Sequence, residues 1–290
     1  MNVFVIGIGS YLGSKLAEHL ESLGFTVTGS SRSGAAAGRH VTRLVLGEPV
    51  TPAIFEQSSV VIHAAHDLQA GATDRNISGI SACFAAARDA GAARQIFLSS
   101  YAARADALSE YGRTKHQIER MFLEGGEIAL RPGLVVGSGG LFARQRRALL
   151  RAPVVPIVGD GATPVAIIAV SHFLEAAEAV LRRSAAGGYS LFYDDRPALR
   201  EFVRAVKRQA GQHPVLAPVP AGLAITALRC ALALGIRVPA DPDQIKSLQS
   251  NQTSPWRSDL PQLLPSRVSE FTLEYALSEL TSPTRPETSP

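Results

Sequence analysis

The fold of this chain is decided by the stretch VFVIGIGSYLG, residues 3–13. Its first four residues are apolar, as in a strand buried on both faces of a parallel sheet. Leu12, Leu16 and Leu20 then share one helical face, and Gly24 provides a stop for that helix. A glycine-rich turn between a buried strand and an amphipathic helix predicts a dinucleotide-binding unit.

Composition indicates a globular protein with a large core. The chain has 290 residues, of which 46% are hydrophobic and 19% charged. These values exclude a disordered chain and leave room for one or two domains. Two cysteines are too few for a disulfide framework or a structural zinc site. Among the 29 basic residues, the lysines are Lys15, Lys115, Lys207 and Lys246, so a lysine inside a motif is informative.

The sequence predicts neither a signal peptide nor a membrane span. No basic region precedes the apolar N-terminal residues. The longest apolar run, 221–234, is interrupted by Arg229 and is too short to cross a bilayer. We expect this run to pack in a lobe core, with capping of a lipophilic pocket or contact with a membrane surface as the alternatives. A cytoplasmic protein without integral membrane association is expected.

Short apolar runs alternate with helical patterns through the first half of the chain. Ile77, Ile80, Phe84 and Ala87 form a second helical face, closed by Gly91. This alternation predicts an α/β fold with a doubly wound parallel sheet. The expected strands are 3–6, 25–28, 41–46, 60–63, 96–98 and 128–130.

The second half is less regular and predicts a smaller lobe. Ser171 has the character of an N-cap for a helix that runs through Leu181. A strand at 189–193 and a helix at 199–206 follow. We expect a Rossmann domain over residues 1–160, with 186–206 completing its sheet, a C-terminal substrate lobe over 161–280, and a disordered tail over 281–290.

The glycine-rich turn is the expected binding site for the pyrophosphate of a dinucleotide. A phosphate approaches the backbone most closely where side chains are absent, and a helix N-terminus offers free N–H groups and a positive dipole end. The residues expected to line it are Gly7, Gly9, Ser10, Tyr11, Leu12 and Gly13.

The end of the second strand distinguishes NAD from NADP. An NAD site places an Asp or Glu there, which accepts hydrogen bonds from the ribose 2′-hydroxyl. Residues 28–33 contain no carboxylate, whereas Ser31 and Arg32 can bind a 2′-phosphate. Arg32 could also be a solvated loop residue. The sequence favours NADP(H), with NAD(H) as the alternative.

Tyr111 and Lys115 form a candidate acid–base pair. Their spacing of four places both side chains on one face of a helix, here expected over 115–123. An ammonium group near a phenol favours the phenolate, so Lys115 is expected to lower the pKa of Tyr111. A surface tyrosine beside a surface lysine is the alternative.

With these motifs in order, the sequence resembles the short-chain dehydrogenase/reductase superfamily, in particular its extended, NAD-dependent epimerase/dehydratase-like branch. The resemblance covers nearly the whole chain. The family's glycine turn corresponds to Gly7, Ser10 and Gly13, with serine in place of the middle glycine. Its other motifs correspond to His63-Ala64-Ala65, Asn76-Ile77-Ser78-Gly79, Ser100, the pair Tyr111 and Lys115, and Leu130-Arg131-Pro132-Gly133.

The resemblance implies a mechanism and site residues. Tyr111 would exchange a proton with the substrate oxygen, Ser100 would hydrogen-bond that oxygen, and Lys115 would also hold the nicotinamide ribose. His63, Ala64, Ala65 and Pro132 would line the cofactor. Tyr101-Ala102-Ala103 lacks the acidic pair of sugar-nucleotide 4,6-dehydratases, which argues against dehydration. A homodimer through the helices at 76–90 and 111–123 is also implied.

Two further clusters have a structural and a functional interpretation. His63, His66 and Asp67 could bind a metal, but their place beside the expected cofactor favours a cofactor-lining or structural role, and we expect no metal site. Arg144, Arg146, Arg147 and Arg151 are expected on a solvated face, or one of them could hold a substrate diphosphate. No nucleic-acid-binding module is present in the sequence.

The sequence therefore predicts an NADP(H)-preferring oxidoreductase or epimerase that transfers hydride at a carbinol or carbonyl carbon of a small-molecule substrate. The substrate class expected first is a nucleotide sugar. One alternative is a ketoreductase acting on a non-sugar, lipophilic carbonyl compound. The other is a non-catalytic NADP-binding regulatory or assembly protein.

Overall fold

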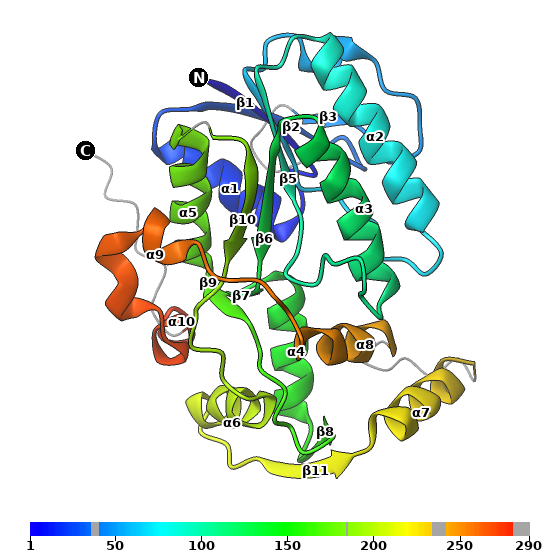
Figure 1. Ribbon diagram of the computed structural model, residues 1–290, viewed down its shortest axis with the longest axis vertical. Coiled ribbons are helices and arrows are strands. Elements are labelled where there is room, and N and C mark those ends of the chain that lie inside the picture. Colours follow the sequence, from blue (N-terminus) through cyan, green and yellow to red (C-terminus); the bar gives the residue numbers. More distant parts are fainter. Residues whose placement is uncertain (36–40, 184, 234–241, 281–290) are drawn as a thin grey trace.

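A computed structural model describes residues 1–35, 41–183, 185–233 and 242–280. A central sheet with its covering helices forms the upper part of Figure 1, and a smaller group of elements lies below the ends of its strands. The tail expected over 281–290 lies outside the described residues.

The central sheet has seven strands in the order β10-β6-β5-β4-β1-β2-β3, and all neighbours pair in parallel. This order confirms the predicted doubly wound α/β fold. The strands are β1 Asn2–Ile6, β2 Thr26–Ser31, β3 Val41–Arg43, β4 Val60–His63, β5 Arg94–Leu98, β6 Ile128–Pro132 and β10 Gly187–Leu191.

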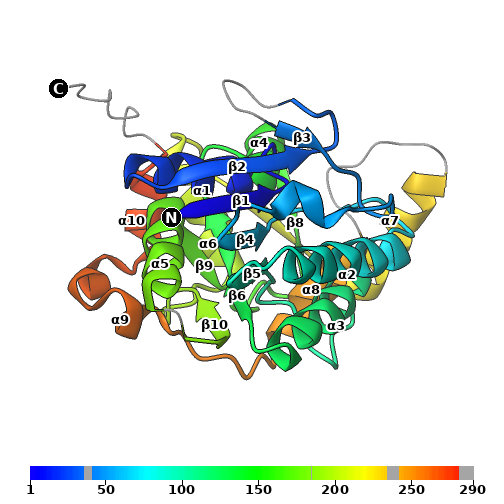
Figure 2. The same cartoon turned by 90° about the horizontal axis from the view of Figure 1, so that it is seen from above.

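Helices cover both faces of the sheet (Figure 2). One face packs against α1 (Tyr11–Ser22) and α5 (Val170–Arg183), and the other packs against α2 (Thr73–Asp89) and α3 (Glu110–Glu124). Along β5, Ile96 belongs to the first core and Phe97 to the second. This alternation explains the unbroken apolar run in the sequence, because every position of a doubly covered strand is buried.

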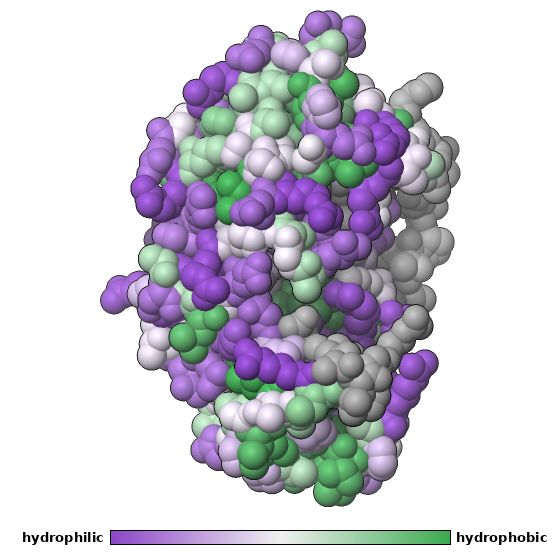
Figure 3. Space-filling view, turned by 90° about the vertical axis from the view of Figure 1, so that its right-hand side faces the viewer, coloured by the Kyte–Doolittle hydropathy of each residue, from purple (hydrophilic) through white to green (hydrophobic). Residues whose placement is uncertain are grey.

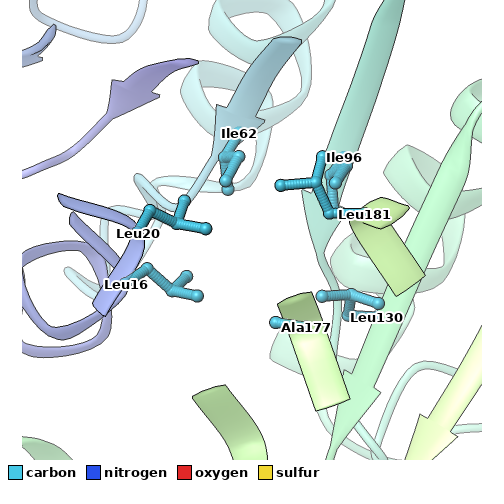
Figure 4. A pocket seen from close by; sticks show the side chains of 7 residues that line it. All are labelled: Leu16, Leu20, Ile62, Ile96, Leu130, Ala177 and Leu181. Atoms are coloured by element: carbon cyan, nitrogen blue, oxygen red, sulfur yellow. The ribbon is translucent and has the colours of Figure 1, made fainter. Parts of the chain in front are cut away.

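A small apolar cavity of about 10 Å³ lies between α1, α5 and the sheet. Figure 4 shows Leu16 and Leu20 facing Ile62, Ile96 and Leu130 across this gap. Its walls are aliphatic and its volume is close to that of one water-sized probe, so it is a packing defect that stays dry.

The lower part is built from two-stranded sheets and helices. β7 (Leu134–Val136) pairs with β9 (Ile167–Ala169), and β8 (Val154–Val158) pairs with β11 (Val215–Val219). The helices are α4 (Gly140–Arg151), α6 (Leu199–Gln209), α7 (Ala221–Ala233) and α8 (Pro242–Asn251). The short helices α9 (Leu260–Leu263) and α10 (Leu273–Ser278) follow, and 3₁₀ turns lie at Pro52–Phe55 and Pro265–Glu270.

Two local predictions about elements are wrong. The strand expected over 41–46 ends at Arg43, because Leu44 and Leu46 turn into the core beneath α2. Ser171 does not cap α5, which begins one residue earlier at Val170. The Ser171 hydroxyl instead donates to Glu279, near the C-terminal end of the described chain.

The prediction that the apolar run at 221–234 packs in a lobe core is wrong for its described side chains. α7 packs against α8, and each side chain over 221–230 is exposed or half-exposed, with Leu223 65% exposed. Figure 3 shows apolar side chains on the surface at this lower end of the molecule, where Val154 and Val215 are also exposed. Within the described residues, no helix is both long enough and apolar enough to cross a membrane.

Candidate active site

The glycine-rich turn lies where the direction of strand order reverses, between β1 and β4. Gly7 has φ +83°, and a Cβ there would lie 2.8 Å from the backbone nitrogen of Ala65. A Cβ on Gly13 would lie 2.3 Å from the carbonyl oxygen of Gly7. Packing inside the protein therefore requires glycine at both positions.

Gly9 is different, because nothing in the protein requires glycine there. It is exposed, and a Cβ would meet only the Cβ of Ser31 at 3.5 Å, an ordinary contact. Ser10 caps α1 by accepting a hydrogen bond from the Gly13 N–H at 3.1 Å. An open glycine beside a helix N-terminus fits a dinucleotide pyrophosphate, and the backbones that would hold it are those of Gly9, Tyr11 and Leu12.

The Tyr11 ring packs against the turn that precedes α4. A Cβ on Gly137 would lie 2.2 Å from the Tyr11 hydroxyl oxygen, and one on Gly139 would lie 2.2 Å from Cδ2 of its ring. Its hydroxyl is enclosed without a hydrogen-bond partner among the described residues. The tyrosine side chain thus joins the dinucleotide turn to the start of the lower part of the molecule.

Ser31 and Arg32 lie at the end of β2, beside Gly9. The Ser31 hydroxyl donates to the Ala35 carbonyl at 3.0 Å and accepts from the Ala35 N–H at 3.1 Å. These bonds close the turn that carries Arg32, which is exposed. The structure places Ser31 in turn formation and leaves Arg32 at the surface near the dinucleotide turn.

Ser100 and Tyr111 meet at the carboxyl end of β5. Tyr111 is half-buried in the first turn of α3, and its hydroxyl interacts with the Ser100 side chain. Burial raises the pKa of Tyr111, and the interaction with Ser100 opposes this rise. The sequence prediction that Tyr111 has a lowered pKa is therefore wrong for the protein alone.

Lys115 lies one helical turn beyond Tyr111 and is 5% exposed. Its Nζ donates to the Leu98 carbonyl at 2.6 Å and lies 5.9 Å from the centre of the Tyr111 ring. Burial lowers the pKa of Lys115 to about 7, although the negative charge of Glu119 opposes this. The rise in the pKa of Tyr111 is caused by burial, so the nearby lysine does not lower that pKa as its spacing suggested.

Two histidines occupy this end of β4. His66 is half-buried and packs edge-on against the Tyr111 ring, with ring centres 5.2 Å apart. Burial and the positive charge of Lys115 lower the pKa of His66 to about 2. His63 is fully buried inside the sheet and its ring pairs with Gln95 at 2.8 Å.

No metal site forms from this cluster. The carboxylate of Asp67 pairs with Arg75 at 2.6 Å, while His63 is held by Gln95. Residues 1–35, 41–183, 185–233 and 242–280 contain no group of three or more His, Cys, Asp or Glu side chains placed to hold a metal ion. Asn76 instead orders the loop, since its side-chain amide accepts from the Asp67 N–H and donates to the Asp67 carbonyl, both at 2.8 Å.

The structure also brings in two residues that the sequence analysis did not single out, Glu119 and Asp243. Glu119 forms a buried ion pair with Arg131 of the predicted strand-end motif. Asp243, from α8, accepts hydrogen bonds from the backbone N–H groups of Glu110 and Tyr111 at 2.9 and 3.0 Å. Glu119 is visible in the sequence as the fourth residue after Lys115, but no local pattern indicates Asp243.

The remaining predicted residues lie around the same edge of the sheet. Ala64 follows β4 and its N–H donates to the Ile6 carbonyl at 2.9 Å. Pro132 is buried at the end of β6, and its carbonyl accepts from the Tyr101 N–H at 2.9 Å. The glycine-rich turn, the carboxyl ends of the strands and the first turns of α1 and α3 thus lie together at the edge of the sheet. This is the edge where doubly wound sheets bind their ligands.

A doubly wound sheet with a glycine turn at its switch point and a Ser, Tyr and Lys set at the next strand ends defines an NAD(P)-dependent enzyme of the short-chain dehydrogenase/reductase type. The chain belongs to the NAD-dependent epimerase/dehydratase family, whose sequence model matches residues 3–191. No curated protein shows significant similarity to the chain.

Solved structures share the fold at low sequence identity. A nucleoside-diphosphate-sugar epimerase from Staphylococcus aureus has a TM-score of 0.73 at 14% identity, over 96% of this chain and 100% of that chain. A UDP-glucose 4-epimerase from Thermus thermophilus, solved with NAD, has a TM-score of 0.62 at 20% identity, over 87% and 98%. A UDP-glucuronic acid 4-epimerase from Bacillus cereus, also with NAD, has a TM-score of 0.64 at 15% identity, over 91% and 98%.

Proposed function

We propose that the protein transfers hydride at a carbinol or carbonyl carbon of a nucleotide sugar, as a reductase or an epimerase. The observation that carries this proposal is the placement of Ser100 and Tyr111 in contact with each other, with Lys115 one turn away, at the strand ends beside the open Gly9. The chemistry that the nicotinamide supplies when bound is the acceptance or donation of a hydride.

The side chains have separate tasks in this proposal. Tyr111 gives its proton to the substrate oxygen, or takes one from it, and Ser100 hydrogen-bonds the same oxygen to fix its position. Lys115 binds the ribose hydroxyls through its ammonium group, which also stabilises the phenolate of Tyr111 as it forms. His66 packs against the Tyr111 ring and keeps it from rotating away.

NADP(H) is the proposed cofactor preference. The exposed Arg32 follows β2 directly, the Ser31 turn holds its backbone, and residues 28–35 contain no carboxylate that would repel a 2′-phosphate. The family name and the NAD-containing relatives make NAD(H) the alternative.

A nucleotide sugar as substrate is supported by the relatives and by one arginine of α4. Arg146 is half-buried, and its Nε is enclosed without a partner in the described part of the chain. Such a group can bind a substrate diphosphate. Arg144, Arg147 and Arg151 are exposed, as expected for a solvated face.

A second candidate, a ketoreductase for a lipophilic carbonyl compound, is favoured by a different observation. Tyr101, which follows Ser100, is buried in a small apolar cluster with Ala166 and Phe192, against which Trp256 packs. Apolar side chains next to Ser100 suit a substrate without a diphosphate.

We also propose a homodimer through α2 and α3. A groove of about 600 Å³ follows the outer side of α3, lined in part by Arg113, His116, Gln117 and Met121. Light scattering on the purified protein should give twice the 30.7 kDa of one chain. A monomeric mass at micromolar concentration would exclude this arrangement.

The test of the proposed reaction uses the purified protein, NADPH or NADH, and a panel of nucleotide sugars and lipophilic ketones. A reductase consumes one reduced cofactor per product, an epimerase interconverts sugars without net consumption, and a non-catalytic protein binds cofactor without turnover. Tyr111→Phe should abolish turnover with little change in cofactor Kd. The control is Tyr189→Phe, because the Tyr189 hydroxyl bonds only the nearby Ala185 carbonyl among the described residues. Wild-type rates in Tyr111→Phe would refute the assignment.

A further inference from the structure

A carboxylate is buried directly behind Lys115. Glu119 is 2% exposed and lies one helical turn after Lys115 on α3. Its Oε1 accepts two hydrogen bonds from Arg131, from Nε at 2.9 Å and from Nη2 at 2.7 Å. Its Oε2 accepts a third from the Ser99 hydroxyl at 2.5 Å. Both oxygens are therefore fixed, which is the geometry of a strong, charge-assisted network.

The partners of Glu119 come from two neighbouring strands. Ser99 immediately precedes Ser100 after β5, and Arg131 lies in β6. The guanidinium is covered by the Trp256 ring, 4.0 Å from its centre, and a Cβ on Gly188 would lie 2.4 Å from Nη2. These contacts confine the Arg131 guanidinium, and the bond from Ser99 connects the carboxylate to the strand end that carries Ser100.

Stability alone does not account for this pair. Burying two charges costs several kcal/mol per ion, and replacing such a pair by apolar residues of the same size often leaves the stability unchanged or increases it. What an apolar pair could not provide is a carboxylate held in place one helical turn from Lys115, although the positive charge of Arg131 offsets part of its effect.

Lys115 meets few other charges. From α3 it faces Tyr111 and Glu119, from the loop after β4 it faces His66, and from β5 it meets the Phe97 ring and the Leu98 carbonyl. Tyr111 and His66 are both neutral near pH 7, since burial raises the pKa of the first and lowers that of the second. In the described structure, the opposite charge that acts on Lys115 is that of Glu119.

We propose that Glu119, fixed by Arg131 and Ser99, is a positioning residue that favours the ammonium form of Lys115 against the effect of burial and holds Ser100 in place relative to Tyr111. Glu119 acts through these residues and does not touch the substrate. The significance of Lys115 rests on the proposed function, because only the ammonium form can donate to ribose hydroxyls and stabilise a phenolate at the same time.

The test reads Lys115 directly by NMR. Lysine labelled with ¹³C at Cε gives at most one signal for each of Lys15, Lys115, Lys207 and Lys246, and Lys115→Arg identifies the one of interest. Glu119→Gln should lower the titration midpoint of Lys115 by about one pH unit or more, because the buried ammonium loses its counter-charge. Glu119→Asp keeps the charge and should keep the midpoint close to wild type.

A matched control uses an exposed pair. Glu18 contacts Lys15 at 2.6 Å on α1, where both side chains are solvated. Glu18→Gln should leave the midpoint of Lys115 almost unchanged, since an exposed charge on another helix acts weakly on a buried group. If Glu119→Gln does not fold, Glu119→Gln with Arg131→Met leaves no unpaired buried charge and should lower the midpoint by a smaller amount, because the positive charge of Arg131 is removed as well.

The inference is overturned if the Lys115 midpoint stays within about 0.2 pH units of wild type in every folded Glu119→Gln variant. The titration needs no substrate, so it is independent of the proposed function. A lowered midpoint in a protein without turnover on any substrate would refute the proposed function alone. Turnover with an unmoved midpoint would refute the role of Glu119 alone. With turnover, the alkaline limit of kcat should move to lower pH together with the midpoint.

Discussion

Asp243 and Tyr111 are 132 residues apart in sequence, yet the Asp243 Oδ2 accepts a hydrogen bond from the Tyr111 N–H at 3.0 Å. Its Oδ1 accepts that of Glu110 at 2.9 Å. The first N–H groups of a helix have no partner within it, so a carboxylate from α8 supplies here what a local N-cap supplies elsewhere. A third N–H group of this helix start, that of Gly112, donates to the Ser109 hydroxyl at 3.1 Å.

Asp243→Ala should therefore weaken both stability and catalysis. The free energy of unfolding should fall by about 0.5 to 2 kcal/mol, the range for loss of a helix cap. Turnover should fall while the cofactor Kd changes little, because α3 carries Tyr111 and loses a support. Denaturant unfolding and steady-state kinetics measure the two effects. Asp160→Ala is the control, since Asp160 caps only its own turn through the Ala162 N–H; equal effects of both variants would contradict this explanation.

Arg32→Ala should reduce the affinity for NADPH and leave that for NADH nearly unchanged. Loss of a charge-assisted hydrogen bond costs about 1.5 to 3 kcal/mol, which corresponds to about a ten- to hundredfold increase in Kd. Calorimetric titration with both cofactors gives the comparison. Arg43→Ala removes an exposed arginine from the neighbouring strand, where it pairs with Glu48 at 2.6 Å, and should have no such effect. Tighter binding of NADH than NADPH by the wild-type protein would show that the preference is wrong.

Gly139→Ala should destabilise the protein through Tyr11. The new methyl group would lie 2.2 Å from the Tyr11 ring, and overpacking of this kind costs about 1 to 3 kcal/mol. Adding Tyr11→Ala should recover part of the loss, giving a coupling energy in a double-mutant cycle. Gly222→Ala is the control, because nothing lies within 4 Å of its Cβ position and alanine favours the helix. Additive effects of the two substitutions would show that Tyr11 and Gly139 do not compete for space.

Acid should destabilise the protein through His63. The amide nitrogen of Gln95 donates to the Phe84 carbonyl, so its oxygen accepts from His63 Nε2–H. Protonation would then add a buried N–H at Nδ1, which has no partner among the described residues. Burial lowers the pKa of His63 to about 4, below its unfolded value near 6.5.

The sign of this effect follows from proton binding. Between about pH 6.5 and 4 the unfolded chain binds the proton and the folded protein does not, so stability is fully present above this window and falls as the pH drops through it. The loss amounts to about 3 kcal/mol for this histidine. His63→Gln should flatten the dependence of the free energy of unfolding on pH, measured by denaturant unfolding between about pH 6.5 and 4. Substitution of the exposed His213 by Gln should not. An equally steep loss in His63→Gln would exclude this origin.

Local patterns predicted those parts of the molecule that local interactions determine. The strand, glycine turn and helix at 2–22, and the helical spacing of Tyr111 and Lys115, follow from periodicity and residue type within a few turns. The pKa of Tyr111 could not be predicted in this way, because it depends on how far burial outweighs the effect of a neighbouring charge. The Asp243 cap has no local signal at all, because its partners are brought together only by the tertiary fold. The apolar composition of α7 suggested a core helix, yet composition does not specify which surface a helix meets.

The protein has one tryptophan, Trp256, and it lies over the guanidinium of Arg131. Its intrinsic fluorescence therefore arises from a single place, where the segment after α8 crosses the strand end behind Ser100. Emission excited at the tryptophan band reports the release of this segment, while far-ultraviolet circular dichroism reports the loss of the helices and sheet as a whole. Recorded on one sample, the two signals would reveal whether the crossing segment detaches before the sheet unfolds, with no label attached to the protein.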